Sequence, residues 1–149
     1  MPGTRLLRSV ACVLLILYTA LLIYWMFLGF GRTLRPGPPY SYNIVPLDTI
    51  RQYWRAMHSF PFRVWGVNLF GNIGVFIPFG VLLPIIWVSM RRIGRLLLTV
   101  VAALIILEVS QMLLGAGTMD VDDIILNVVG VCCGRVGYVF LRKRLGIAS

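Results

Sequence analysis

The stretch LLLTVVAALIILEVSQMLLG, residues 96–115, decides the fold because its one charged side chain, Glu108, interrupts a run that is otherwise uncharged and mostly apolar. About 20 such residues in a helix cross the roughly 30 Å hydrocarbon core of a bilayer. A helix is required because it satisfies every backbone polar group within the segment, which lipid cannot do. Similar runs at about 9–30, 66–89 and 123–141 predict an all-α integral membrane protein with four transmembrane helices.

The composition of the chain agrees with this assignment. The chain has 149 residues, of which 59% are hydrophobic and 13% are charged, and its mean hydropathy is +0.89. Because soluble domains carry roughly 25% charged residues, we expect a single membrane domain over residues 1–149. Cys12, Cys132 and Cys133 lie in apolar runs, which favours packing roles over a disulfide framework or metal ligation. The basic residues form no recognition motif, so no nucleic acid partner is expected.

Basic residues predict the orientation of the spans. Short loops rich in lysine and arginine stay in the cytoplasm, and three such groups share one side if the spans alternate. These groups are Arg5 with Arg8, then Arg91, Arg92 and Arg95, and finally Arg142, Lys143 and Arg144. We therefore expect a multi-pass protein with both termini in the cytoplasm. The first span exceeds the apolar part of a signal peptide and is expected to remain as an anchor.

The first outer segment, residues 31–65, is predicted to contain a short amphipathic helix at about 47–58. Its apolar residues recur at helical spacing; they are Leu47, Ile50, Trp54 and Met57. This helix is too short and too charged to span, so we expect it on the outer membrane interface. Arg51 and Arg55 are four residues apart and share one face. Either they contact the phosphate of a lipid or lipid-linked substrate, which the guanidinium group fits well, or they are ordinary loop charges.

Depth counting places several acidic and amide side chains in one layer. A helix rises about 1.5 Å per residue, and antiparallel spans bring the start of 66–89, the end of 96–115 and the start of 123–141 to the same depth. The expected layer faces the outer leaflet and forms the candidate polar site. Its members are Asn68, Asn72, Glu108, Gln111, Asp120, Asp122, Asp123 and Asn127.

Each member of this layer also has a purely structural interpretation. Aspartates such as Asp122 or Asp123 are common caps of helix N-termini, and amides often bond neighbouring membrane helices. If the layer is a site, two chemistries are open. Glu108, Asp122 and Asp123 are hard oxygen ligands that suit a divalent cation such as Mg²⁺ or Ca²⁺, and no other cofactor is expected. Alternatively, two carboxylates are a general acid and a general base. No serine or cysteine lies beside a histidine in this layer, so no catalytic residue is assigned.

Four stretches together resemble the VanZ family of bacterial membrane proteins. They are NIVPLDTI (43–50), NLFGNIGVFIPFGVLLP (68–84), Glu108 with Gln111, and DVDDIILNVVG (120–130). The resemblance covers about residues 40–135, which is most of the predicted domain. It implies a protein of the bacterial cell membrane that lowers susceptibility to teicoplanin and related lipoglycopeptide antibiotics without altering the terminal dipeptide of the peptidoglycan precursor.

Three functional classes remain open. The leading hypothesis is a protein whose polar site engages a membrane lipid, a lipid-linked cell-wall precursor or the lipoglycopeptide antibiotic itself, with Arg51 and Arg55 on phosphate. The second hypothesis is a metal-assisted enzyme acting on a lipid-linked substrate. The third is a small structural subunit of a membrane complex, for which Gly130 and Gly134 supply a GxxxG packing motif. The sequence leaves the oligomeric state and the ligand open.

Overall fold

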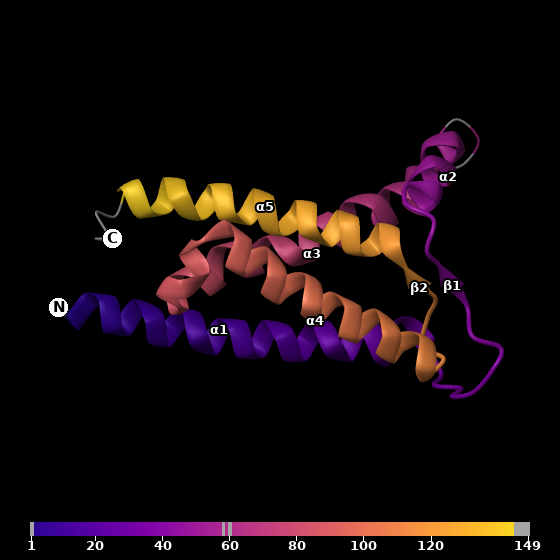
Figure 1. Cartoon of the computed structure of the whole chain (residues 1–149), viewed down its shortest axis with the longest axis horizontal. Coiled ribbons are helices and arrows are strands. Elements are labelled where there is room, and N and C mark those ends of the chain that lie inside the picture. The colour runs from indigo at the N-terminus through magenta and orange to yellow at the C-terminus, as the bar shows by residue number, and fades with distance from the viewer. Residues whose placement is uncertain (1, 58, 60, 145–149) are drawn as a thin grey trace.

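The computed structural model describes residues 2–57, 59 and 61–144, and its architecture is a bundle of four long helices with a short helix across one end (Figure 1). The long helices are α1 (Pro2–Phe27), α3 (Phe62–Ile86), α4 (Ile93–Leu113) and α5 (Val121–Arg144). The remaining elements are short; they are the helix α2 (Asp48–Ala56), the 3₁₀ turns η1 (Gly29–Gly31) and η2 (Val88–Arg91), and the strands β1 (Tyr42–Asn43) and β2 (Met119–Asp120).

All four long helices are long and apolar enough to cross a membrane, which confirms the predicted all-α fold with four spans. The boundaries differ from the predicted ones by a few residues. For example, α5 continues through Arg142, Lys143 and Arg144. These basic residues in the last turn complement the negative end of the helix dipole, so the helix extends past its apolar part.

A glycine ends α4 and turns the chain toward the site. Gly115 has φ +63, a left-handed conformation that favours glycine. The N–H of Ala116 donates to the carbonyl of Gln111 at 2.8 Å, and that of Gly115 donates to the carbonyl of Met112 at 3.2 Å. These two bonds form a Schellman motif, which satisfies the last carbonyls of the helix. A Cβ at Gly115 would also collide with the backbone carbonyl of Arg35, which packs against the turn.

Close backbone contact between α3 and α5 forms the centre of the bundle. A Cβ at Gly130 would collide with the carbonyl oxygen of Ile73, and one at Gly134 would collide with that of Ile77. The GxxxG motif therefore packs within this chain, and its face is occupied by α3. This arrangement removes the observation that motivated the structural-subunit hypothesis.

The two ends of the bundle differ in charge. Figure 1 shows that α1 begins and α5 ends at one end, which we call the termini end, while α2, β1 and β2 lie at the other, the α2 end. The acidic side chains of the sequence all lie near the α2 end, in α2, in β2, in the last two turns of α4 and in the first turn of α5; they are Asp48, Asp120, Glu108, Asp122 and Asp123. The predicted alternation of the spans is thus observed. Which end faces the cytoplasm stays a prediction.

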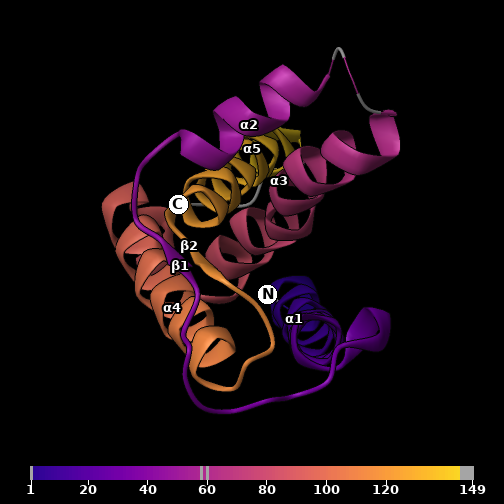
Figure 2. The ribbon, with the colours of Figure 1, turned by 90° about the vertical axis from the view of Figure 1, so that its right-hand side faces the viewer.

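The amphipathic helix α2 is slightly shorter than predicted and crosses the ends of α3 and α5 (Figure 2). Ile50 and Tyr53 are half-buried on the protein side, whereas Trp54 is 65% exposed. His58, at the predicted end of the helix, lies outside the described residues. Trp54 was predicted on the same apolar stripe as Ile50, but here it points away from the bundle, as suits a membrane-interface anchor.

Candidate polar site

Asp122 fixes α2 to the bundle. Its side chain is 0% exposed, and its two carboxylate oxygens accept the backbone N–H groups of Leu47 at 2.5 Å and Ile50 at 3.0 Å. The first N–H groups of a helix lack partners inside the helix, and α2 has no side-chain cap of its own because Leu47 occupies the cap position. Asp122 therefore supplies from α5 the cap that the sequence of α2 lacks. Its negative charge also suits the positive end of the α2 dipole.

Asp120 joins β2 to the segment before α2. Its carboxylate accepts the hydroxyl of Thr49 at 2.6 Å and the side-chain amide of Asn43 at 3.3 Å. The strands pair Asn43 with Asp120, so the backbone brings these side chains together. The backbone N–H of Asp120 donates to Glu108 Oε2 at 3.2 Å, which places the 3% exposed Glu108 side chain directly beneath β2.

Two further members of the predicted layer connect the long helices. Asn72 on α3 donates from its amide to Asp123 on α5. Gln111 on α4 donates from its amide to the carbonyl of Met26 at 2.9 Å, and Arg32 donates to the same carbonyl at 2.5 Å. The carbonyl of Met26 lies in the last turn of α1, where backbone acceptors have no partner within the helix. The Gln111 bond joins the end of α4 to the end of α1, while the Arg32 bond fixes the turn that follows α1.

Asn127 and Asn68 differ in their surroundings. Asn127 is 3% exposed, and its amide oxygen has no hydrogen-bond donor among the described residues. A buried acceptor without a donor costs about 1–3 kcal/mol. Asn127 lies one helical turn from Asp123 along α5, and its amide oxygen has unused bonding capacity. Asn68 is exposed on α3 and lies outside the lining of the pocket described next.

A polar pocket of about 550 Å³ opens at the α2 end. Its walls come from α2, the turn after α1, the end of α4 and the start of α5. The lining residues are Arg32, Asn43, Asp48, Thr49, Gln52, Tyr53, Gln111, Gly117, Thr118, Asp120 and Asp123. Glu108 and Asp122 lie behind this lining and support it. Of the predicted layer, Gln111, Asp120 and Asp123 line this pocket, and Asp122 holds its α2 wall in place.

The arginine in the pocket wall is Arg32. Arg51 and Arg55 are exposed on α2 and lie outside the pocket lining. Arg32 shares the pocket with Asp120 and Asp123, so the pocket carries charges of both signs. A guanidinium group beside carboxylates provides donors for an anionic group and acceptors for a cationic one within one cavity.

Tyr53 contributes a neutral hydroxyl to the pocket. Its partial burial, and then the negative charges of Asp123 and Asp120, raise the pKa of this hydroxyl above its usual value. The phenol therefore stays protonated at physiological pH and can donate a hydrogen bond.

Sequence reasoning had not assigned Tyr53, Asn43, Thr49 or Arg32 to the site. For Asn43 and Thr49 the signal was their position in the segment NIVPLDTI, residues 43–50, one of the stretches that resemble the VanZ family. The pairing of β1 with β2 that carries Asn43 to Asp120 was not predicted. A strand of two residues has no recognisable alternation of polar and apolar side chains.

The described residues contain no cluster of three or more His, Cys, Asp or Glu side chains arranged to hold a metal ion. Of the three predicted ligands, Asp122 has both oxygens engaged by backbone N–H groups of α2. Glu108 accepts a backbone N–H through one oxygen, and Asp123 accepts an amide. The arrangement is suited to hydrogen-bonding a polar ligand, with Asp123, Tyr53 and Arg32 facing the cavity.

Comparisons with known proteins match most of the chain. A family model described as VanZ/LLP1 matches residues 14–142. Protein VanZ of Enterococcus faecium is 28% identical over 107 residues, a stretch that covers 70% of this chain and 65% of that relative. The matched part thus spans slightly less than two thirds of the length of the curated relative. No solved structure matches the chain.

Proposed function

The chain belongs to the VanZ/LLP1 family, and we propose that it lowers bacterial susceptibility to teicoplanin-type lipoglycopeptides by engaging a lipid or cell-wall precursor at the α2 end. The observation that carries this proposal is the polar pocket, in which Arg32 and three acidic side chains line one cavity at the end of a membrane-spanning bundle. A headgroup whose acyl or polyprenyl chain stays in the bilayer reaches such a pocket without leaving the membrane.

The chemistry of the pocket favours a headgroup that carries both phosphate and polar or cationic groups. Arg32 donates hydrogen bonds to the phosphate, since a guanidinium group binds phosphate through two parallel hydrogen bonds. Asp123 accepts from hydroxyl, amide or ammonium groups, and Tyr53 donates a hydrogen bond. Lipid-linked cell-wall precursors combine such groups. Arg51 and Arg55, on the exposed side of α2, are placed to attract anionic headgroups from the surrounding interface rather than to hold them in the pocket.

A pair of neighbouring loop arginines provides a matched test. Arg32→Gln removes the pocket guanidinium, while Arg35→Gln removes the same charge from an exposed side chain outside the lining. We would measure teicoplanin and vancomycin inhibitory concentrations in a susceptible Gram-positive host with each variant at equal membrane abundance. The proposal expects wild type and Arg35→Gln to protect selectively against teicoplanin and Arg32→Gln to lose most of that protection.

Three outcomes would contradict parts of the proposal. Equal protection by both variants would exclude the pocket arginine as a ligand contact. Loss of protection in the Arg51→Ala/Arg55→Ala variant alone would indicate that the phosphate contact lies on the exposed face of α2. No protection by wild type would show that the family function does not extend to this chain.

A further inference from the structure

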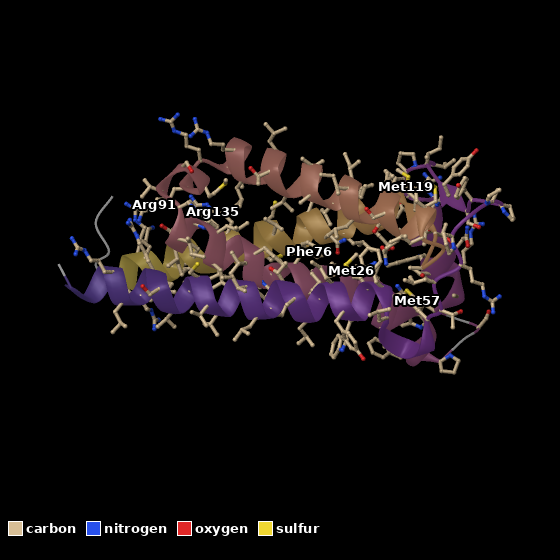
Figure 3. The ribbon with its side chains drawn as sticks, turned by 90° about the horizontal axis from the view of Figure 1, so that it is seen from below. Met26, Met57, Phe76, Arg91, Met119 and Arg135 are labelled. Atoms are coloured by element: carbon tan, nitrogen blue, oxygen red, sulfur yellow. The ribbon has the colours of Figure 1, made fainter. Side chains whose placement is uncertain are left out.

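An arginine at the termini end has unmet hydrogen-bonding capacity. Arg135 lies in α5, and its Nη2 donates to the backbone carbonyl of Arg91 at 2.8 Å. Its Nε and Nη1 are buried and have no acceptor among the described residues. The guanidinium carbon lies 5.0 Å from the centre of the Tyr138 ring. The Tyr138 hydroxyl, on a side chain 1% exposed, has no hydrogen-bond partner within the described part of the chain. Figure 3 shows Arg91 and Arg135 beside each other.

The charge on Arg135 has no acidic side chain to neutralise it. The guanidinium group of arginine carries a positive charge. Arg135 is half-buried, and a charge taken partly out of water without a counter-charge is destabilising. The acidic residue nearest along α5 is Asp123, about 18 Å away at the helical rise per residue, and the other acids belong to the same far end of the bundle. A salt bridge requires contact within about 4 Å, so the five acidic side chains cannot supply one.

Neighbouring residues make this end attractive to anions. The link between α3 and α4 carries Arg91, Arg92 and Arg95, and α5 ends with Arg142, Lys143 and Arg144. Arg91 Nε approaches the carbonyl of Pro84 at 3.5 Å, so its side chain lies along the same junction of α3, η2 and α5. Positive potential summed over such a group raises the local concentration of anions, and basic pockets between membrane helices bind acidic lipid headgroups.

We propose that Arg135 binds a phosphate-type anion at the termini end of the bundle, between η2 and α5. Phosphate oxygens accept from the Nε and Nη1 groups of Arg135 and from the Tyr138 hydroxyl, while Arg91 adds a second positive charge. The phosphate comes either from the headgroup of an anionic phospholipid or from free phosphate. This site lies at the opposite end of the bundle from the polar pocket, and its existence does not depend on the proposed function.

The test uses full-length protein in nanodiscs of phosphatidylcholine, with or without phosphatidylglycerol. In each case the buffer contains either sodium phosphate or sodium chloride at the same ionic strength. The readouts are the thermal unfolding midpoint and lipid binding by native mass spectrometry. We expect phosphatidylglycerol to stabilise the wild-type protein. We also expect it to bind wild type roughly tenfold more tightly than it binds Arg135→Gln, because hydrogen bonds to charged groups are strong. Arg92→Gln, which removes an exposed arginine of the same link, serves as the matched control and should bind within twofold of wild type.

A reversal of stability separates a binding site from a structural role. In phosphatidylcholine alone, Arg135→Gln should unfold at the same temperature as wild type or higher, since it removes an uncompensated charge. With the anion present, wild type should become the more stable protein. If Arg135→Gln fails to fold, Tyr138→Phe keeps the ring, removes only the hydroxyl, and should bind several-fold more weakly.

Two results distinguish the source of the phosphate, and two overturn the proposal. Stabilisation by phosphatidylglycerol but not by sodium phosphate identifies a lipid headgroup, whereas stabilisation by sodium phosphate in neutral lipid identifies free phosphate. Equal behaviour of wild type with and without both anions would overturn the proposal. So would wild-type anion binding by folded Arg135→Gln, or by Tyr138→Phe where Arg135→Gln does not fold.

Discussion

Replacing Asp122 by asparagine should release α2 from the bundle while leaving the spanning helices folded. The aspartate accepts two backbone N–H groups, from Leu47 at 2.5 Å and Ile50 at 3.0 Å. Asparagine has one oxygen, so its amide N–H₂ must face one of these donors. The change removes one bond to a charged acceptor, worth about 1.5–3 kcal/mol, and brings two donors together. The strained backbone of Leu47, at φ +67, loses the bond that holds it.

Hydrogen exchange measures this release directly. A loss of about 2 kcal/mol in the free energy of local opening corresponds to roughly thirtyfold faster exchange of the amides in α2. We would compare exchange in peptides covering α2 (Asp48–Ala56) and α4 (Ile93–Leu113) for wild type, Asp122→Asn and Asp123→Asn. Asp123 neighbours Asp122 and accepts from Asn72 rather than from α2, so its substitution should leave exchange in α2 within about threefold of wild type.

Unchanged exchange in α2 of Asp122→Asn would refute the capping role of Asp122. Equal acceleration of exchange in α2 and α4 would also refute it, because Asp122 would then stabilise the whole bundle rather than the docking of α2. A matching change in Asp123→Asn would show that charge in this region, rather than the two capping bonds, sets the stability of α2.

Three further predictions follow from packing, burial and charge. Gly130→Ala should lower the free energy of unfolding by about 3 kcal/mol because its Cβ meets the backbone of α3, whereas Gly137→Ala, which meets open space, should be nearly neutral in thermal unfolding. Asn127→Leu should leave stability unchanged or raise it by about 1 kcal/mol by removing a buried acceptor without a donor, yet reduce teicoplanin protection if the amide contacts ligand. Because the folded-state pKa of Tyr53 is raised, stability should fall as pH rises above the usual tyrosine pKa of about 10, and Tyr53→Phe should lessen that fall in alkaline denaturation.

The spans and the depth of the polar layer could be predicted from the sequence because both follow from properties of single helices. The length of an apolar run shows whether it can cross a membrane, and the helical rise gives the depth of Glu108 or Asp123 along its helix. Antiparallel order then brings these side chains to one end whatever the packing angles are.

The role of each side chain within the layer could not be predicted in this way. Asp122 and Asp123 are adjacent in sequence and chemically identical, yet one caps α2 and the other faces the pocket. The side chains of adjacent residues on a helix point about 100° apart, so their roles depend on which neighbouring element each side chain contacts. The same limit applies to α2, where spacing placed Arg51 and Arg55 on one face but could not say that this face points away from the pocket.

Direct binding tests the central claim of the account, that the pocket at the α2 end holds a phosphate-bearing lipid. We would measure the affinity of the purified protein in neutral nanodiscs for a polyprenyl-pyrophosphate-linked cell-wall precursor, comparing wild type with Arg32→Gln and Arg35→Gln. The account predicts binding by wild type and Arg35→Gln and a roughly tenfold or greater loss in Arg32→Gln, as expected for a charge-assisted contact. Equal affinity of all three proteins, or no binding by wild type, would contradict it, and chelator-sensitive conversion of the precursor would indicate an enzyme instead.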